Sequence, residues 1–386
     1  MLNFTFENPT RIFFGKGQVK RLGEEVKRYA QRVLLLYGGG SIKANGIYGQ
    51  VVAALNESGI SYVELGGVKP NPRIDSVREG VRLCRENDLQ LVLAAGGGSV
   101  IDCAKIIAAG FYYNGDPWDF FIRRARIAQA LPVGVVLTLA ATGSEMNNNA
   151  VISNEETREK KGLSSNLLFP RFAILDPVYT YTVPPLQTAA GVADIMSHVF
   201  EQYFSANSDA YLQDRMCEAV LKTCIRYGPI ACAEPDNYEA RANLMWASTI
   251  GLNGILSVGK LTDWATHMME HEVSALYDVT HGVGLAILTP YWMEYVLDEA
   301  TVSRFALYAR NVWELTEGDE QELARQGIAK TREFFKSLGL PATLGEVGVK
   351  EDSLELMAER AAGGGTLGRL RKLGKEDVLR ILRNAL

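Results

Sequence analysis

The chain has 386 residues and a mass of 42.4 kDa, long enough for two domains of about 150 to 200 residues. With 47% hydrophobic and 22% charged residues, its composition is that of an ordinary globular protein. The net charge is −5 and the basic residues form no cluster, which argues against nucleic acid or an anionic membrane as a partner. No run of about 18 apolar residues and no secretory signal pattern occurs, so we expect a cytoplasmic protein.

Up to about Val183 the sequence alternates short apolar runs with amphipathic segments. Strands are predicted over residues 32–37, 61–65, 89–95, 133–138 and 172–175, and a helix over residues 74–87. Strand and helix in alternation are typical of a parallel sheet that is covered by helices. We therefore predict an α/β domain over residues 1–183.

Two glycine triplets follow predicted strands in this domain. Gly96–Gly98 opens a predicted helix, where backbone N–H groups can approach a pyrophosphate and Ser99 adds a hydroxyl. Asp102 follows one turn later, within reach of a ribose or a nicotinamide. The second triplet, Gly38–Gly40, precedes Ser41. Neither triplet is the GxGxxG fingerprint, so the alternative that both are only structural turns stays open.

From Pro184 onward the hydrophobic period becomes that of helices. Long helices are predicted over residues 186–204, 208–227, 238–253 and 264–277. Pro185 suits the first turn of a helix, where a backbone N–H has no intrahelical partner to lose. We therefore predict a second, all-helical domain over residues 184–386.

All four histidines lie in this second half, between residues 198 and 281. Asp194 and His198 are four residues apart, as are His267 and His271, so each pair shares one face of a helix about 6 Å apart. Imidazoles with a carboxylate suit Zn²⁺ or Fe²⁺ and suit Ca²⁺ or Mg²⁺ poorly. Any one of these histidines is more often a packing residue, but packing does not require all four to gather. The clustering therefore predicts a metal site that includes His281.

Together these segments resemble the iron-containing (group III) alcohol dehydrogenase family. The resemblance covers nearly the whole chain and rests on residues 6–15, 96–105, 138–146, 194–198 and 267–286. Residues 37–41 and 368–377 are similar to the butanol dehydrogenase branch. The resemblance implies a Rossmann-like dinucleotide-binding domain followed by an all-α metal-binding domain, an architecture like that of dehydroquinate synthase.

The resemblance also implies roles for individual residues. Asp194, His198, His267 and His281 would bind the metal, and His271 would stand beside it without binding. With the second triplet included, the expected coenzyme-binding residues are Gly38, Gly39, Ser41, Asn71, Gly97, Gly98, Ser99, Asp102, Thr138, Leu139, Thr142, Ser144, Asn149 and Lys160. The last three would lie toward the nicotinamide and the substrate. His271, Asp102 and Lys160 are the catalytic candidates.

The implied activity is the NAD(P)H-linked interconversion of primary alcohols and aldehydes, similar to that of butanol dehydrogenases. A divalent metal would act as a Lewis acid on the substrate oxygen while the nicotinamide exchanges a hydride. His271, with an ordinary pKa near 6.5, is predicted to relay the proton, or alternatively to orient a metal ligand. We expect a homodimer that acts on small molecules.

Two other functions would also use a nucleotide and a metal. The first is a carbon–oxygen elimination of the dehydroquinate synthase type, which regenerates its coenzyme and gives no net change in NADPH absorbance. The second is metal-dependent hydrolysis with Glu145, Glu270 or Glu272 as the base. Four protein ligands leave little room for both substrate and nucleophile, which disfavours hydrolysis.

The coenzyme is predicted to be NADP(H) in preference to NAD(H). Enzymes that choose NAD commonly place a carboxylate after the second strand, where it repels a 2′-phosphate, and such family members often have an aspartate at Gly39. The segment from Gly38 to Lys43 contains no acid, and its backbone N–H groups, Ser41 and Lys43 can accept a phosphate. The sequence leaves open the choice of Fe²⁺ or Zn²⁺ and the identity of the alcohol.

Overall fold

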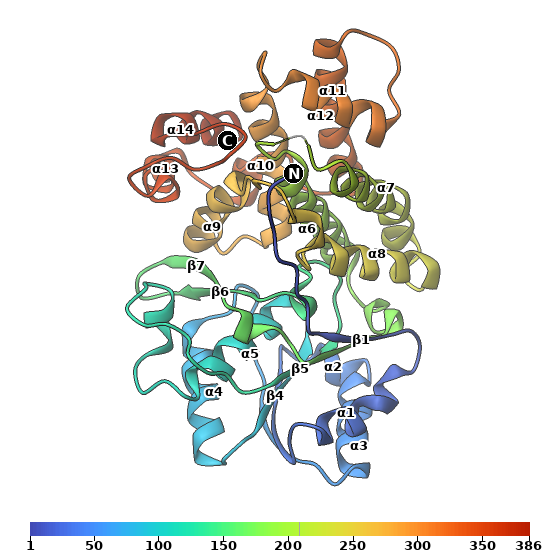
Figure 1. The fold of residues 1–386 in the computed structure, drawn as a ribbon, viewed down its shortest axis with the longest axis vertical. Coiled ribbons are helices and arrows are strands. Elements are labelled where there is room, and N and C mark those ends of the chain that lie inside the picture. Colours follow the sequence, from blue (N-terminus) through green and yellow to red (C-terminus); the bar gives the residue numbers. More distant parts are fainter. Residues whose placement is uncertain (208) are drawn as a thin grey trace. The chain divides into compact units, whose positions relative to one another are not determined.

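The computed structural model describes residues 1–207 and 209–386, which form two compact units. The first unit comprises Glu7–Val183 and Pro235–Thr249 (Figure 1). The second comprises Met1–Phe6, Pro184–Glu234 and Ile250–Leu386. The assignment of domains to residues 1–183 and 184–386 stays a prediction.

A six-stranded parallel sheet forms the centre of the first unit, with the strand order β1-β8-β5-β4-β2-β3. Its strands are β1 (Arg11–Phe14), β2 (Arg32–Tyr37), β3 (Ser61–Leu65), β4 (Leu91–Gly96), β5 (Val133–Leu137) and β8 (Phe172–Leu175). Strands β2, β4, β5 and β8 are almost entirely buried, as expected for apolar runs covered on both faces. The predicted parallel α/β fold is confirmed.

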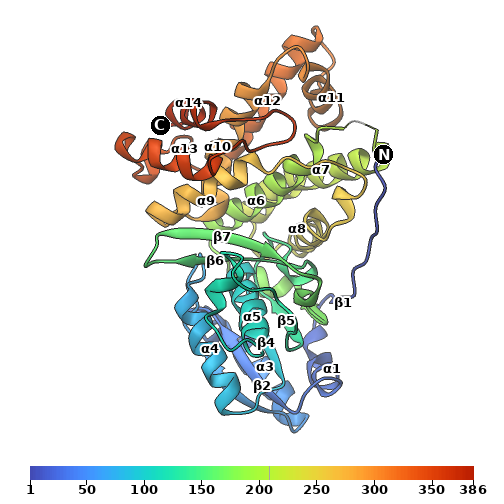
Figure 2. The same cartoon turned by 60° about the vertical axis from the view of Figure 1, so that its left-hand side comes forward.

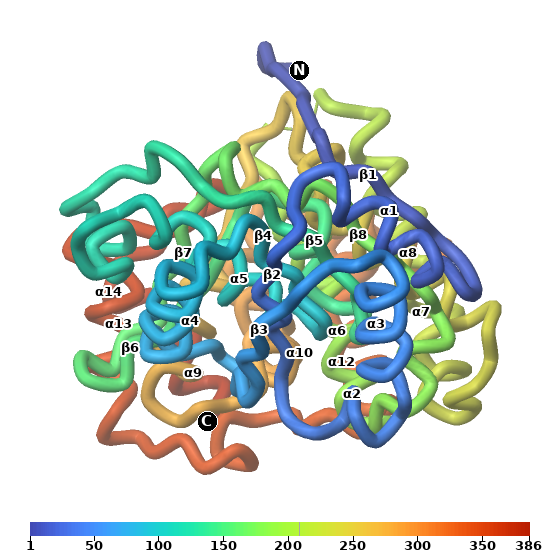
Figure 3. Tube along the Cα trace, turned by 90° about the horizontal axis from the view of Figure 1, so that it is seen from below, coloured from blue at the N-terminus to red at the C-terminus, as the bar shows by residue number. Residues whose placement is uncertain are grey.

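Helices cover both faces of this sheet. They are α1 (Leu22–Lys27), α2 (Ser41–Ala44), α3 (Ile47–Glu57), α4 (Ile74–Glu86) and α5 (Gly98–Gly110). On β2, Val33 and Leu35 join the core under α1 and α3, whereas Leu34 and Leu36 join the core under α4 and α5. Figure 3 shows α3 and α4 on opposite sides of β2 and β3.

Three strands are not predicted by the sequence pattern. The edge strand β1 has only four residues, and β6 (Asn149–Asn154) and β7 (Glu159–Ser164) form a separate antiparallel pair. Strand β7 reads Glu-Lys-Lys-Gly-Leu-Ser, which carries little apolar alternation. This ribbon packs on α5 through β6 (Figure 2).

The second unit is built from helices. They are α6 (Pro185–Tyr203), α7 (Tyr211–Ala233), α9 (Ala265–Tyr277), α10 (His281–Val296), α11 (Val302–Trp313), α12 (Glu320–Ser337), α13 (Leu354–Ala362) and α14 (Lys375–Asn384). Helix α8 (Tyr238–Gly251) belongs to the first unit up to Thr249. Among the described residues of the second unit, the only strand-like pairing is an isolated bridge between Leu367 and Leu373. The predicted helical character is confirmed.

Helix α6 is the central helix of this unit and packs against α7 and α10. It begins at Pro185, as predicted, and its side chains are buried from Thr188 to Tyr203. Ser208, the predicted start of the next helix, lies outside the described residues. None of the helices in the described part of the chain combines the length and the apolar character needed to span a bilayer.

Candidate metal centre and coenzyme-binding edge

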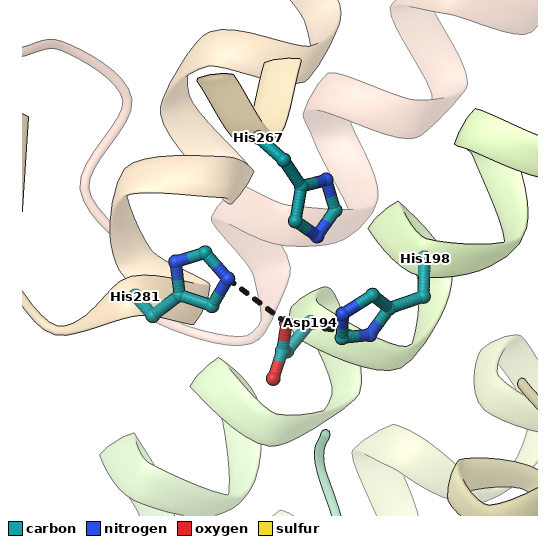
Figure 4. A group of neighbouring side chains, drawn as sticks. All are labelled: Asp194, His198, His267 and His281. Atoms are coloured by element: carbon teal, nitrogen blue, oxygen red, sulfur yellow. Dashed lines mark ion pairs between the residues drawn. The ribbon is translucent and has the colours of Figure 1, made fainter. Parts of the chain in front are cut away.

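The four predicted metal ligands come together from three helices of the second unit. Asp194 and His198 lie on α6, His267 lies on α9, and His281 is the first residue of α10 (Figure 4). One potential ligand atom from each lies within 4.8 Å of all the others. Oδ1 of Asp194 is 3.5 Å from Nδ1 of His198 and 3.8 Å from Nε2 of His281.

The environment of this cluster fits a metal ion. Nδ1 of His198 and Nε2 of His267 are buried and have no hydrogen-bond partner among the described residues, which is costly unless something binds them. Burial, together with the neighbouring imidazoles of His267 and His281, holds the pKa of His198 well below its usual value. His198 is therefore neutral, the form in which imidazole binds metals. Three imidazoles and a carboxylate suit Fe²⁺ or Zn²⁺.

Two buried glutamates orient two of the imidazoles. Oε1 of Glu201 lies 2.9 Å from Nδ1 of His267, and Oε2 of Glu270 contacts Nδ1 of His281. Both carboxylates are almost completely shielded from solvent. With Nδ1–H donating to a carboxylate, Nε2 of each imidazole is left to bind a metal.

Glu201 is not among the residues predicted from the sequence, and Glu270 is predicted there only as a hydrolytic base. Glu201 follows Asp194 and His198 on the same face of α6, at the i, i+4, i+7 spacing of a helix. That spacing places Glu201 on the same face as the two ligands, but it does not show which histidine the carboxylate contacts. Glu270 is instead engaged with His281 and with the Ser274 hydroxyl.

His271 lies on α9, one turn after His267, and is buried. Its ring centroid is 5.8 Å from that of His281. A nitrogen of His271 also lies within 4.8 Å of ligand atoms of Glu270 and His281, as a second group of potential ligands. His271 therefore stands beside the four-residue cluster.

The turn between β4 and α5 lies against the segment that follows β5, all within the first unit. A Cβ added at Gly98 would lie 2.3 Å from Oγ1 of Thr142, and one at Gly97 would lie 3.1 Å from Cβ of Leu139. Glycine is needed here for close approach, since neither residue has a positive φ. The start of α5, a helix of 13 residues, carries the positive end of the helix dipole, which favours an anion next to Ser99.

Asp102 and Ser144 belong to a buried polar network in this unit. Asp102 accepts hydrogen bonds from Ser144 Oγ at 2.5 Å and from the Val151 N–H at 2.9 Å. Lys105, fully buried, donates to Ser144 Oγ and to the Asn149 carbonyl, each at 2.7 Å. Burial lowers the pKa of Lys105 to about 8. The network joins α5 to the segment that carries Ser144 and Asn149, a role for Lys105 that the sequence does not predict.

The other predicted coenzyme-binding residues lie along the first unit as follows. Gly38, Gly39 and Ser41 follow β2, whose last residue pairs with Ala95 of β4. Thr138 follows β5 and donates its N–H to the Gly96 carbonyl at 3.1 Å. Asn71 is buried with a φ of 50°, and Lys160 is buried on β7. The carboxyl ends of β2, β4 and β5 therefore bring together most of the set at one edge of the sheet, where doubly wound sheets bind ligands.

Two family models match the chain. One, described as iron-containing alcohol dehydrogenase, matches residues 9–177. The other, described as the C-terminal part of the Fe-containing alcohol dehydrogenase family, matches residues 188–386. The first match includes the coenzyme-binding edge, and the second includes the four-residue cluster.

Individual relatives extend over most or all of the chain. The NADH-dependent butanol dehydrogenase A of Clostridium acetobutylicum is 56% identical over 100% of both chains. The NADPH-dependent aldehyde reductase YqhD of Escherichia coli is 44% identical over 93% of both. The crystal structure of NADH-dependent butanol dehydrogenase A from Thermotoga maritima matches with a TM-score of 0.96 at 43% identity, covering 100% of this chain and 99% of that one.

Proposed function

The chain belongs to the iron-containing alcohol dehydrogenase family and is an NAD(P)H-linked alcohol dehydrogenase or aldehyde reductase; from this premise we propose that it acts on small primary alcohols and aldehydes of the butanol type. The observation that carries the proposal is the cluster of Asp194, His198, His267 and His281, whose ligand atoms lie within 4.8 Å of one another. The rival elimination and hydrolysis reactions are not favoured by the relatives.

The metal site is proposed to consist of these four residues. A divalent ion bound there supplies a Lewis acid for the oxygen of the alcohol or aldehyde. Glu201 and Glu270 hold His267 and His281 so that Nε2 of each points away from the carboxylate, and burial keeps His198 neutral. The donor set accepts Fe²⁺ and Zn²⁺, and the family description favours iron.

The coenzyme is proposed to bind with its pyrophosphate at the start of α5, where Gly97 and Gly98 leave the backbone N–H groups accessible. Asp102 holds Ser144 and Val151 and so positions the segment between β5 and β6. Lys160 and Asn149 are proposed to lie toward the nicotinamide. His271 is proposed to relay the proton between the substrate oxygen and water.

A panel of aldehydes tests the function. Purified protein is analysed for metal and then assayed with butanal and other short aldehydes by the loss of NADH or NADPH absorbance. We expect stoichiometric coenzyme oxidation that disappears with the metal in His198→Ala. Turnover without net coenzyme oxidation would instead indicate an elimination, and turnover without any coenzyme would indicate hydrolysis.

The preference for NADP(H) over NAD(H) is a further part of the proposal. The segment from Gly38 to Lys43 contains no acid, which supports it, whereas the Clostridium relative is named for NADH and the Escherichia coli relative for NADPH. A Cβ at Gly39 meets no described atom within 4 Å, so an aspartate fits there without strain. We expect Gly39→Asp to shift kcat/KM toward NADH. A wild type that already favours NADH tenfold would contradict the preference.

We also propose that the protein acts as a cytoplasmic homodimer. Light scattering of the purified full-length chain measures the mass, for which we expect about twice the 42.4 kDa of one chain. A mass equal to one chain across the working concentration range would contradict the dimer.

A further inference from the structure

The segment from Gly38 to Lys43 contains no acid, but the carboxylate of Glu64, from the neighbouring strand β3, lies beside it. Glu64 is on β3, which pairs with β2 so that Glu64 stands opposite Leu35. Its Oε2 accepts a hydrogen bond from the Tyr37 hydroxyl at 2.7 Å, and its Oε1 accepts one from the Tyr48 hydroxyl at 2.6 Å. Tyr37 is the last residue of β2, directly before Gly38. Both carboxylate oxygens are thus held at the carboxyl end of this strand.

Lys43, on α2, completes the group. Its Nζ lies 3.7 Å from Oε2 of Glu64, and 4.9 Å and 4.6 Å from the ring centroids of Tyr37 and Tyr48. Two aromatic faces and one carboxylate therefore hold the ammonium group in place. Its side chain is still 49% exposed, so a ligand can reach it.

The charges of this group cancel. The hydrogen bond from Tyr48 lowers the pKa of Glu64 more than burial raises it, so the carboxylate is ionised at neutral pH. Lys43 contributes the opposite charge at 3.7 Å. From the sequence, Lys43 is a cation near Gly38–Ser41 that can accept a phosphate; in the folded chain, Glu64 supplies a counter-charge to it.

We propose that Glu64 is a specificity-determining residue for the coenzyme: it holds Lys43 on the two tyrosines, offsets its charge, and so weakens the binding of a ribose 2′-phosphate. The inference rests on the proposed function, in which the carboxyl end of β2 receives the adenosine ribose, as it does in doubly wound sheets. Held by Glu64 and the two rings, Lys43 is less available to pair with a 2′-phosphate, whereas a 2′-hydroxyl does not need the cation. The side chains involved need not touch the nicotinamide end.

Dissociation constants of NADH and NADPH, measured from coenzyme fluorescence without substrate, test the proposal. We expect Glu64→Gln to raise the affinity for NADPH relative to NADH at least about fivefold, and Lys43→Met to lower it. The difference in this relative affinity between Glu64→Gln and wild type should shrink at high salt, because the effect is electrostatic. In the Lys43→Met background, most of the effect of Glu64→Gln should disappear, since the two residues are coupled.

Glu57→Gln is the matched control, because it removes one charge from an exposed position on α3 and leaves Lys43 in place. An unchanged NADPH to NADH ratio in Glu64→Gln would overturn the proposal, as would a full-sized effect in the absence of Lys43. Should Glu64→Gln fail to fold, Glu64→Asp takes its place, because the shorter side chain moves the carboxylate away from Lys43. It too should raise the affinity for NADPH relative to NADH. If wild type binds neither coenzyme, the proposed function fails; if it binds both and the ratio never moves, only this inference fails.

Discussion

His267 and His281 each have one ring nitrogen engaged by a glutamate that solvent does not reach. Glu201 also accepts hydrogen bonds from the backbone N–H of His267 at 3.0 Å and from that of Trp264 at 2.6 Å. The start of α9 therefore fixes its carboxylate. A ligand that is held in this way loses little freedom when a metal binds. The glutamates are therefore expected to act on metal affinity more than on the chemical step.

Glu201→Gln tests this role, because the amide keeps the size of the side chain but removes its charge. We expect metal affinity to fall by roughly 10- to 100-fold, measured by competition with a chelator of known affinity. Glu218→Gln is the control: Glu218 is also buried in the second unit, but it accepts from Tyr203, Arg215 and Asn311. An equal loss of metal affinity in Glu201→Gln and Glu218→Gln would mean that the loss reflects damage to the fold and not the contact between Glu201 and His267.

His271→Ala separates the proton relay from metal binding. Because His271 lies beside the cluster, the variant should keep its metal by the same competition measurement, while aldehyde reduction falls by about 100-fold. The dependence of kcat on pH that arises from the ionisation of the relay group should also disappear. An unaltered rate and profile would reduce His271 to a packing residue.

Site residues that lie close together in the sequence could be predicted, whereas contacts between distant residues could not. Asp194 and His198 lie one helical turn apart, so their meeting requires only that the segment be helical. Glu201 meets His267, and Glu64 meets Lys43, only after distant elements pack together, and periodicity does not reveal which faces meet. The roles of Glu201, Glu64 and Lys105 therefore required the folded structure.

At the scale of elements, apolar content decided what could be predicted. The buried strands β2 and β8 and the helices α6 and α9 were predicted to within about a residue, because long apolar runs and clear periods mark them. Strand β1 is a partly exposed edge strand, β7 carries little apolar alternation, and β6 pairs only with β7, so none of the three stands out in the sequence. The fold class was accessible from the sequence, whereas the ribbon that carries Lys160 was not.

A buried ion network joins three segments of the helical unit. Asp214 on α7 accepts from both Nη atoms of Arg304 on α11 and from Nζ of Lys260, each at 2.6 Å. Burial alone would raise the pKa of Asp214, but the hydrogen bonds from Arg304 and Lys260 outweigh it and lower the pKa. One carboxylate thus pairs with two buried cations.

Asp214→Asn leaves those cations without a counter-charge. We expect the free energy of unfolding, from denaturant titration, to fall by about 3–5 kcal/mol at neutral pH. The folded-state pKa lies below 3.8, so the carboxylate stabilises fully above that pH and loses its contribution as the pH falls through the folded-state pKa. The difference between wild type and variant should accordingly narrow in strong acid.

The exposed pair of Lys222 and Glu314, 2.9 Å apart, provides the comparison. Solvent screens this pair, so Glu314→Gln should leave the free energy of unfolding almost unchanged. If Asp214→Asn cost as little, the buried network would contribute nothing beyond an ordinary surface ion pair.

At the scale of the whole molecule, the two proposed binding functions are divided between the units. The metal ligands all belong to the second unit, and the predicted coenzyme-binding residues all belong to the first. Each ligand is therefore expected to stabilise its own unit. A protein of this kind need not unfold in a single two-state transition, so the effect of each ligand is best followed separately.

The last prediction concerns metal removal. An ion bound by Asp194, His198, His267 and His281 ties α6, α9 and α10 together, and binding to the folded state alone stabilises by about 2.7 kcal/mol at a concentration of 100 Kd. Calorimetry should therefore show a lower unfolding midpoint after chelation and recovery with Fe²⁺ or Zn²⁺. His198→Ala should lose this metal-dependent shift yet keep the shift produced by NADPH, because Gly97 and Gly98 belong to the other unit. A metal-dependent shift that persists in His198→Ala would mean that the ion binds elsewhere in the chain.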